Sequence, residues 1–157
     1  MIRASYFSMN STVFNADCLD GMKQYPDKYF DLAIVDPPYG IGIGVAQQGK
    51  WVSSRMTKKG WDSAAPAPEY FDELRRVSQN QIIWGGNYFP LPPSRCYVVW
   101  DRGEGFYGRD FAECEQAWVS VDGNAKIFKR DPLARGDYHR KIHPTQKPIA
   151  LYEWLLT

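Results

Sequence analysis

Cysteine, net charge and long apolar runs are all scarce in this sequence. The three cysteines are an odd number and include no CxxC pair, which argues against a disulfide framework and against a structural zinc site. No apolar run approaches the roughly 20 residues that cross a bilayer, and the first residues lack the apolar core of a signal peptide. We therefore expect a cytoplasmic chain with no bound metal and no membrane association.

The near-neutral charge limits how the protein binds other molecules. Its formal net charge is +1, so affinity for a polyanion must come from local clusters of basic residues. The 157 residues and the 44% hydrophobic content fit one domain, residues 1–157. Aromatic residues are abundant, at 15% of the chain, and those in polar, glycine-rich surroundings are candidates for stacking on a flat ligand.

Runs of apolar residues predict an α/β fold, a mixed sheet with helices on its faces. The expected strands are residues 11–17, 30–35, 81–86, 96–103, 115–122 and 124–130. The expected helices are residues 18–26, 67–79 and 147–157. Gly123 separates the last two strands and predicts a terminal antiparallel hairpin. Ligands of such sheets bind beyond the carboxyl ends of the strands.

One of these strands ends in an unusual way, with Asp36-Pro37-Pro38-Tyr39 directly after the apolar run. Two consecutive prolines cannot donate to a strand ladder, so the strand has to end there. Such a turn can simply terminate a strand. It also carries an acid, a rigid carbonyl and an aromatic ring to the edge where ligands bind, which makes it the first candidate for function.

The turn resembles the catalytic motif of S-adenosyl-L-methionine (AdoMet)-dependent DNA amino-methyltransferases, in the subgroup whose catalytic motif precedes the cofactor motif. The stretches "NADCLDGM", "IIWGGNYF" and "HPTQKP" follow the order of that family. The resemblance implies a Rossmann-like AdoMet-dependent methyltransferase fold. It also implies methyl transfer to the exocyclic amine of a base in double-stranded DNA, as in DNA methylation by restriction-modification enzymes.

The resemblance assigns the catalytic turn to Asp36, Pro37, Pro38 and Tyr39. The amine of a base is a poor nucleophile because its lone pair is delocalised into the ring. The Asp36 carboxylate and the Pro37 carbonyl would accept the two amino protons and stabilise the developing positive charge. Tyr39 would stack on a base flipped out of the duplex. By family analogy, the aspartate favours adenine N6 over cytosine N4.

The same resemblance assigns AdoMet binding to two further segments besides the catalytic acid. The residues concerned are Asp17, Cys18, Asp36, His143, Thr145, Gln146 and Lys147. Each segment has a simpler interpretation. Asp17 can be the N-cap of the helix that follows it, and residues 143–145 can cap the last helix.

Basic residues with interleaved aromatics predict the contact with DNA. The candidates are Lys50, Arg55, Lys58, Lys59 and Arg140. Asp62 is the only acid close to the first four, and Trp51 and Trp61 lie among them. Such residues fit phosphate contact and base stacking, although a run of charge is also typical of a solvated loop.

The sequence departs from the family in one respect, because the glycine-rich cofactor turn expected after "HPTQKP" is absent. We therefore expect an incomplete domain whose catalytic strand lies near an open sheet edge. Such an edge favours association, for instance as a homodimer. Two other functions stay open, namely methylation of another amine or amide in RNA or protein, and DNA binding without catalysis.

Overall fold

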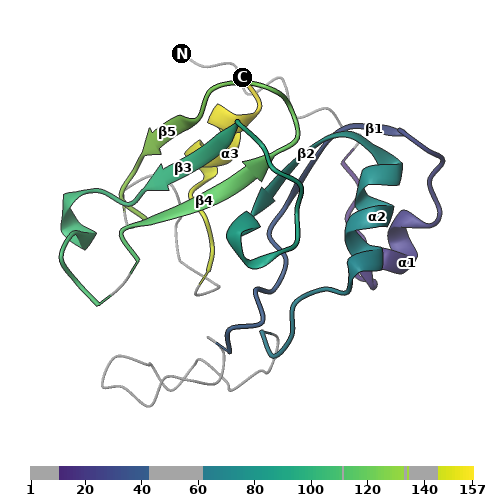
Figure 1. The fold of residues 1–157 in the computed structure, drawn as a ribbon, viewed down its shortest axis with the longest axis horizontal. Helices are drawn as coiled ribbons and strands as arrows, with labels where there is room; N and C mark the ends of the chain where they lie inside the picture. Colours follow the sequence, from purple (N-terminus) through teal and green to yellow (C-terminus); the bar gives the residue numbers. More distant parts are fainter. Residues whose placement is uncertain (1–10, 43–61, 111, 133, 135–144) are drawn as a thin grey trace.

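A mixed five-stranded sheet organises the described part of the chain (Figure 1). The computed structural model describes residues 11–42, 62–110, 112–132, 134 and 145–157. In chain order the elements are α1 (Cys18–Met22), β1 (Phe30–Val35), α2 (Pro68–Val77), β2 (Ser78–Trp84), η1 (Gly86–Tyr88), β3 (Tyr97–Asp101), η2 (Glu104–Phe106), β4 (Cys114–Val119), β5 (Lys126–Lys129) and α3 (Ile149–Leu155). This confirms the predicted α/β class with a mixed sheet.

The first two strands form a parallel pair connected by helix α2. Their register runs from Phe30 opposite Ser78 to Val35 opposite Ile83. Parallel neighbours need a crossover, and α2 provides it. The helix starts with a proline in its first turn, where the missing N–H costs nothing. Its buried face is spaced at helical intervals and rests on the sheet, with Phe71, Leu74 and Val77.

Four of the five strands point the same way. The strand order is β1-β2-β4-β3-β5, in which β4 runs antiparallel to both of its neighbours and β5 runs parallel to β3. The carboxyl ends of β1, β2, β3 and β5 therefore meet at one edge of the sheet, together with the first residues of β4. Asp36, Gly85, Arg102 and Glu115 come from these strand ends.

The predicted terminal hairpin is wrong. Strand β4 pairs with β2 on one side and with β3 on the other, so neither of its edges is left for β5. β5 pairs instead with the outer edge of β3, where Val99 lies opposite Ile127. Burial explains this choice, because Ala117, Trp118 and Val119 of β4 are buried as in a central strand, whereas Ile127 is exposed. Gly123 marks a turn without specifying the partner strand.

The predicted strand at residues 11–17 is also wrong. This segment contains no strand, and Val13 and Phe14 are exposed. Strand β1 is therefore an edge strand of the described sheet. Its side chains still alternate, since Leu32 and Ile34 pack on one face of the sheet and Ala33 and Val35 on the other. Both faces of β1 are thus partly buried, and the burial is incomplete because one edge of the strand is open.

Each face of the sheet has its own hydrophobic cluster. On one face, α3 contributes Leu151 to a cluster built on Trp84 and Trp100. Both indoles are essentially inaccessible to solvent, and burial of a side chain of this size stabilises a fold by about 4–6 kcal/mol. On the other face, α2 and the residues after β2 cover Ile83 and Trp118. The site described below lies where the strands leave these two clusters.

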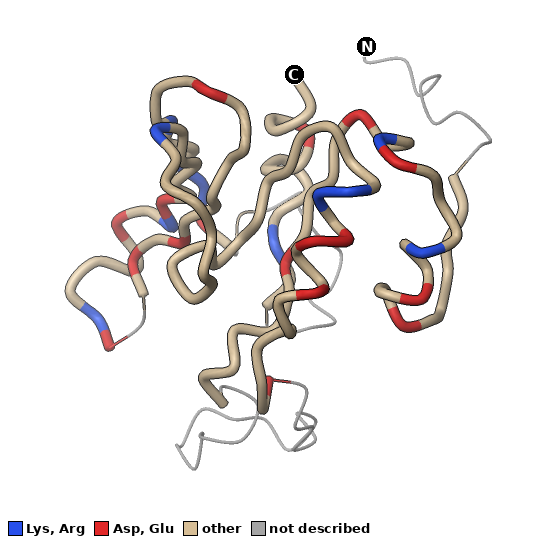
Figure 2. The backbone as a smooth tube through the Cα atoms, turned by 45° about the vertical axis from the view of Figure 1, so that its right-hand side comes forward, with Lys and Arg blue, Asp and Glu red and all other residues tan. Residues whose placement is uncertain are grey.

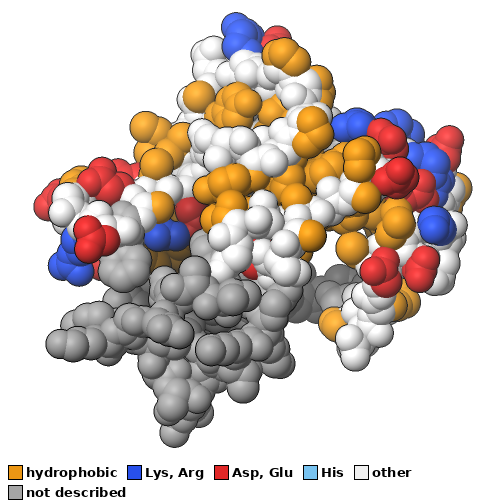
Figure 3. Space-filling model, turned by 60° about the horizontal axis from the view of Figure 1, so that its bottom comes forward, with side chains coloured by type: hydrophobic (Ala, Val, Ile, Leu, Met, Phe, Trp, Pro, Cys, Tyr) orange, Lys and Arg blue, Asp and Glu red, His pale blue; other side chains and the backbone are white. Residues whose placement is uncertain are grey.

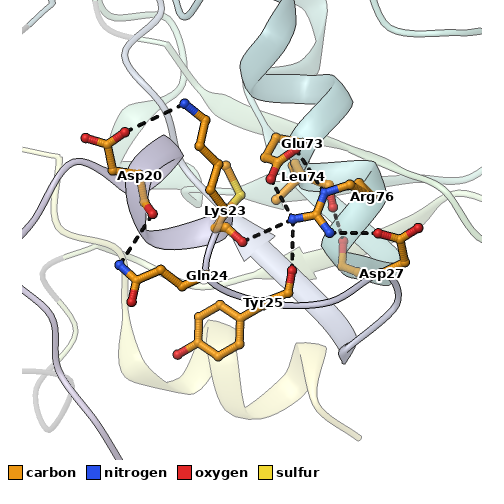
Figure 4. Close-up of polar contacts among 10 residues, drawn as sticks. Asp20, Lys23, Gln24, Tyr25, Asp27, Glu73, Leu74 and Arg76 are labelled. Atoms are coloured by element: carbon orange, nitrogen blue, oxygen red, sulfur yellow. Dashed lines mark hydrogen bonds and ion pairs between the residues drawn. The ribbon is translucent and has the colours of Figure 1, made fainter.

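The turn after α1 is fastened to α2 by the guanidinium of Arg76 (Figure 4). It donates to Asp27 at 2.7 Å, to Glu73 at 2.6 Å and to the carbonyl oxygens of Met22 and Tyr25 at 3.3 and 2.9 Å. The segment between α1 and β1 thus obtains polar partners on the second helix. We call this group the helix-pair network.

Acidic and basic residues are interspersed over the described chain, and neither sign is confined to one part of it (Figure 2). Figure 3 shows the molecule turned so that the bottom of Figure 1 comes forward. In this view, hydrophobic side chains gather in the middle and charged side chains lie to either side. None of the helices in the described ranges has the length and apolar character to cross a membrane.

Candidate active site

The carboxylate of Asp36 contacts Lys147, although 111 positions separate the two residues in the sequence. The Lys147 Nζ lies 2.6 Å from Asp36 Oδ2. Only 1% of the lysine side chain is exposed, against 27% of the aspartate side chain. The Asp-Pro-Pro-Tyr turn therefore meets Lys147, the fifth residue of the "HPTQKP" stretch, and the acid at this contact remains accessible from solvent.

Further charges extend this contact across the strand ends. Lys147 Nζ also lies 3.0 Å from Oε2 of Glu115, the second residue of β4, and Oε1 of Glu115 accepts from Arg102, which follows β3. Burial raises the pKa of the Glu115 carboxyl, but the charges of Lys147 and Arg102 and their hydrogen bonds outweigh it, so the net pKa lies below its usual value. Asp36, Lys147, Glu115 and Arg102 form what we call the strand-end network.

Tyr39 faces the same carboxylate from the other end of the Asp-Pro-Pro-Tyr turn. Its hydroxyl donates to Asp36 Oδ1 at 2.9 Å, and its ring stacks on Tyr88 with centroids 4.8 Å apart and planes 14° from parallel. Burial and the charge of Asp36 raise the pKa of the phenol well above its usual value, so the hydroxyl stays a donor. Tyr88 is 45% exposed and gives the ring pair a solvent-facing side.

Gly85 lets the Tyr39 ring lie against the end of β2. Its φ of +69° is in the left-handed region, which glycine adopts without steric cost. A Cβ atom at this position would overlap the Tyr39 ring. Gly85 of the pair in "IIWGGNYF" is therefore explained by the approach of the Asp-Pro-Pro-Tyr turn to β2, and Gly86 by the approach of Trp118 in β4, whose Cβ would lie 2.5 Å from a Cβ at position 86.

Lys147 lies in the segment before α3, and its ammonium reaches the strand ends, where it contacts Asp36 and Glu115. Pro148 is the N-cap of α3 and makes no side-chain cap hydrogen bond, so Thr145 is not the N-cap residue; His143 and Pro144 of the predicted cap lie outside the described residues. The ammonium of Lys147 lies 5.0 Å from the centre of the buried Trp84 ring, a cation–π distance. Among the described residues, the indole N–H of Trp84 and the Nε–H of Arg102 are buried beside this network and have no hydrogen-bond partner.

Asp17 has the simpler of its two predicted roles. Its Oδ1 accepts from the backbone N–H groups of Leu19 and Asp20 at 2.8 and 3.3 Å, so it is the N-cap of α1. Cys18 is exposed. Burial raises the pKa of Tyr70 to about 12, and the electrostatic effect of nearby Cys18 adds to this shift. An AdoMet contact by either residue stays a prediction.

The remaining predicted residues divide into two groups. Thr145 and Gln146 are half-buried just before Lys147. His143, Lys50, Arg55, Lys58, Lys59 and Arg140 lie outside the described residues. In the described ranges, no group of three or more His, Cys, Asp or Glu side chains could hold a metal ion.

Sequence reasoning missed several residues that shape the site. Glu115 and Arg102 were not predicted as site residues, because charged residues at strand ends are normally exposed to solvent. Asp62 appeared only as an isolated acid among basic residues, yet it is buried and accepts a hydrogen bond from the backbone of Tyr39 in the Asp-Pro-Pro-Tyr turn. The sequence signal for Tyr88 was available, since it follows a glycine pair at the end of an apolar strand.

Comparison of the sequence with models of protein families gives no match, and comparison with curated proteins gives none either. The function of the chain is therefore inferred from its own residues and their geometry.

Proposed function

We propose that the chain is the catalytic part of a DNA methyltransferase that transfers a methyl group from AdoMet to the exocyclic amine of a flipped base, adenine N6 in the first place. The observation that carries this proposal is the 2.6 Å contact between Asp36 and Lys147. It joins the two motifs of the family resemblance at the carboxyl ends of the parallel strands. The parallel β1–α2–β2 unit also fits a Rossmann-like methyltransferase fold.

Asp36 is suited to accept a hydrogen bond from the target amine. A carboxylate offers about four acceptor positions, and the hydroxyl of Tyr39 and the ammonium of Lys147 take one on each oxygen. Capacity for a substrate hydrogen bond therefore remains on a side chain that solvent reaches. The two fixed donors hold the carboxylate in one orientation, and a preorganised acceptor stabilises developing positive charge without reorganising.

Pro37 supplies the second acceptor. Its carbonyl follows Asp36 in the turn, and its fixed φ limits the motion of that carbonyl. Two acceptors on one amino group draw its lone pair out of conjugation with the ring, which makes the nitrogen a better nucleophile. The stacked rings of Tyr39 and Tyr88 provide an aromatic surface that offsets part of the unstacking energy of a flipped base.

The residues at the strand ends also fit AdoMet. The unpartnered N–H groups of Trp84 and Arg102 can donate to acceptor groups such as a carboxylate or ribose hydroxyls. Half-buried Thr145 and Gln146 directly precede Lys147 in the sequence. When bound, AdoMet supplies an activated methyl group on a sulfonium. The Lys147 ammonium is already bound by two carboxylates, so Lys147 contributes by holding Asp36.

A methyl-transfer assay with labelled AdoMet and double-stranded DNA tests the proposal. The unmodified chain is expected to label the DNA, and N6-methyladenine is expected after hydrolysis to nucleosides. Asp36→Ala should lower the rate at least about 100-fold, the size typical of losing one charge-stabilising contact in a transition state, while keeping affinity for DNA. Asp36→Asn guards against a folding defect because it keeps one acceptor oxygen and the side-chain shape.

A control variant comes from the other end of the same strand. The exposed carboxylate of Asp31 accepts from Gln79 at 3.0 Å, so Asp31→Asn removes a β1 charge far from the carboxyl end and should leave the rate unchanged. N4-methylcytosine as the product would instead identify the cytosine enzyme. An unmodified chain without transfer activity would contradict the proposal.

DNA binding without catalysis is the second candidate, because both oxygens of Asp36 already hold a donor within the chain. In that case Asp36 only joins two segments of the protein. Binding of a fluorescent duplex without methyl transfer by the unmodified chain would favour this function. The predicted basic residues Lys50, Arg55, Lys58, Lys59 and Arg140 are the candidates for DNA contact under both functions.

A further inference from the structure

Asp62 holds the backbone of the catalytic turn. Its Oδ1 accepts from the N–H groups of Tyr39 and Gly40 at 2.7 and 2.9 Å. Its own carbonyl accepts from the N–H of Gly42 at 3.0 Å. Only 2% of Asp62 is exposed. Hydrogen bonds from N–H groups to a carboxylate are stronger than those between neutral groups, so one buried residue fixes three positions of the turn.

The backbone of the turn lies beyond the strand ladder. The pairing of β1 with β2 ends at Val35, and Pro37 and Pro38 have no N–H to donate. Tyr39 and Gly40 therefore carry the first backbone donors after Asp36. Gly40 has a φ of +73°, and a Cβ atom there would lie 2.6 Å from the backbone nitrogen of Ala65. The segment that begins at Asp62 is thus packed directly against the turn.

This placement bears on both acceptors of the proposed reaction. The Pro37 carbonyl and the Tyr39 ring belong to the same short turn as the N–H groups that Asp62 binds. Lys147 fixes the side chain of Asp36, whereas Asp62 fixes the main chain that follows it. Displacement of a reacting group by about 1 Å can reduce a rate on the order of 100-fold.

We propose that Asp62 is a positioning residue for methyl transfer, which orients the Pro37 carbonyl and the Tyr39 ring by binding the N–H groups of Tyr39 and Gly40. This inference rests on the proposed function. Its chemistry is separate from that of the reacting groups, because Asp62 acts on the turn and not on the base or on AdoMet. No proton or methyl group passes through it.

Two variants of Asp62 separate charge from hydrogen bonding. Asp62→Ala removes the acceptor, and Asp62→Asn keeps a neutral acceptor oxygen of the same shape. We expect Asp62→Ala to lower kcat by about 10- to 100-fold with less than about a twofold change in KM for DNA. Asp62→Asn should recover most of this loss. A defect limited to stability would not be rescued selectively in kcat.

Amide hydrogen exchange provides a readout that does not depend on activity. The exchange of the Tyr39 and Gly40 amides should accelerate at least about tenfold in Asp62→Ala and less in Asp62→Asn, while core amides of β2 keep their protection. Asp122→Ala is the matched control, because Asp122 is an exposed acid paired with Arg95 at 3.0 Å. It should change neither exchange nor kcat.

The outcomes distinguish the two proposals. Loss of amide protection together with the kcat loss and its rescue by asparagine supports the positioning role. Unchanged exchange in Asp62→Ala, or lost protection with normal kcat, overturns it. An unmodified chain without transfer activity overturns the proposed function itself, and this is recognised before any variant of Asp62 is measured.

Discussion

In the described part of the chain, Lys147 and Arg76 each lie between two carboxylates, and the surroundings of these two cations differ. In the strand-end network, Lys147 bridges Asp36 and Glu115 with 1% of its side chain exposed. In the helix-pair network, Arg76 bridges Asp27 and Glu73, and 76% of the Asp27 side chain is exposed (Figure 4). The first lies under the ends of four strands, and the second lies on the surface between α1 and α2.

The difference indicates what each network is for. Exposed ion pairs gain little, because water and salt screen them. The stability supplied by Arg76 therefore comes mainly from its hydrogen bonds to the backbone of the segment before β1. A buried charge has to overcome a desolvation penalty, and an apolar core of the same volume is often as stable. The burial of Lys147 beside the most unusual turn of the chain thus favours a functional reason for keeping it.

The largest effect is expected when the buried network loses one of its acids. Glu115→Ala leaves Lys147 with Asp36 alone and takes from Arg102 its carboxylate partner. Removing one member of a buried ion pair costs about 3–5 kcal/mol, so the free energy of unfolding should fall by that amount. Urea unfolding followed by circular dichroism measures it. A loss below about 1 kcal/mol would mean that the strand-end network is solvated, as the helix-pair network is.

Much of the scaffold around these networks was predictable from the sequence. The apolar run before Asp36 and the amphipathic run from Pro68 identified β1 and α2, because their periodicity reflects the faces that they bury. The partner of β5 was not predictable in the same way. Strand pairing depends on which edge is free, and residues 126–129 show only that a strand forms.

The site was predictable where the chemistry is unusual. Asp36 and Tyr39 stood out because they flank two consecutive prolines, and Lys147 stood out because it belongs to the "HPTQKP" stretch. The structure brings these three residues together. Glu115 and Asp62 did not stand out. Their burial results from tertiary packing of segments far apart in the chain, and an acid in a polar stretch gives no local sign of it.

The pH dependence of stability provides a test of intermediate size. The folded-state pKa of Glu115 is lowered, so its contribution to stability is present above the unfolded pKa of about 4.3 and is lost as the pH falls through the folded value. Each pKa unit corresponds to about 1.4 kcal/mol. Glu115→Gln keeps the side-chain shape but cannot titrate. The difference in unfolding free energy between the unmodified chain and this variant should therefore be largest near neutral pH and should shrink below about pH 4.

Urea unfolding at several pH values measures this difference. Asp27→Asn is a suitable control, because its exposed carboxylate makes a surface contact only. The curves of Asp27→Asn and the unmodified chain should stay nearly parallel. A constant difference for Glu115→Gln down to about pH 3 would show that the loss comes from packing and not from charge.

The smallest effect is expected from the helix-pair network. Asp27→Ala removes one of the two carboxylates at Arg76, which keeps Glu73 and the carbonyl oxygens of Met22 and Tyr25. Because the pair is exposed, the melting temperature should change by less than about 2 °C. The change should disappear in about 1 M salt, where the Debye length is about 3 Å, whereas the Glu115→Ala defect should persist because buried pairs are screened much less. Equal losses for the two variants, with equal salt sensitivity, would mean that burial does not separate the two networks, and the functional interpretation of Lys147 would lose its main support.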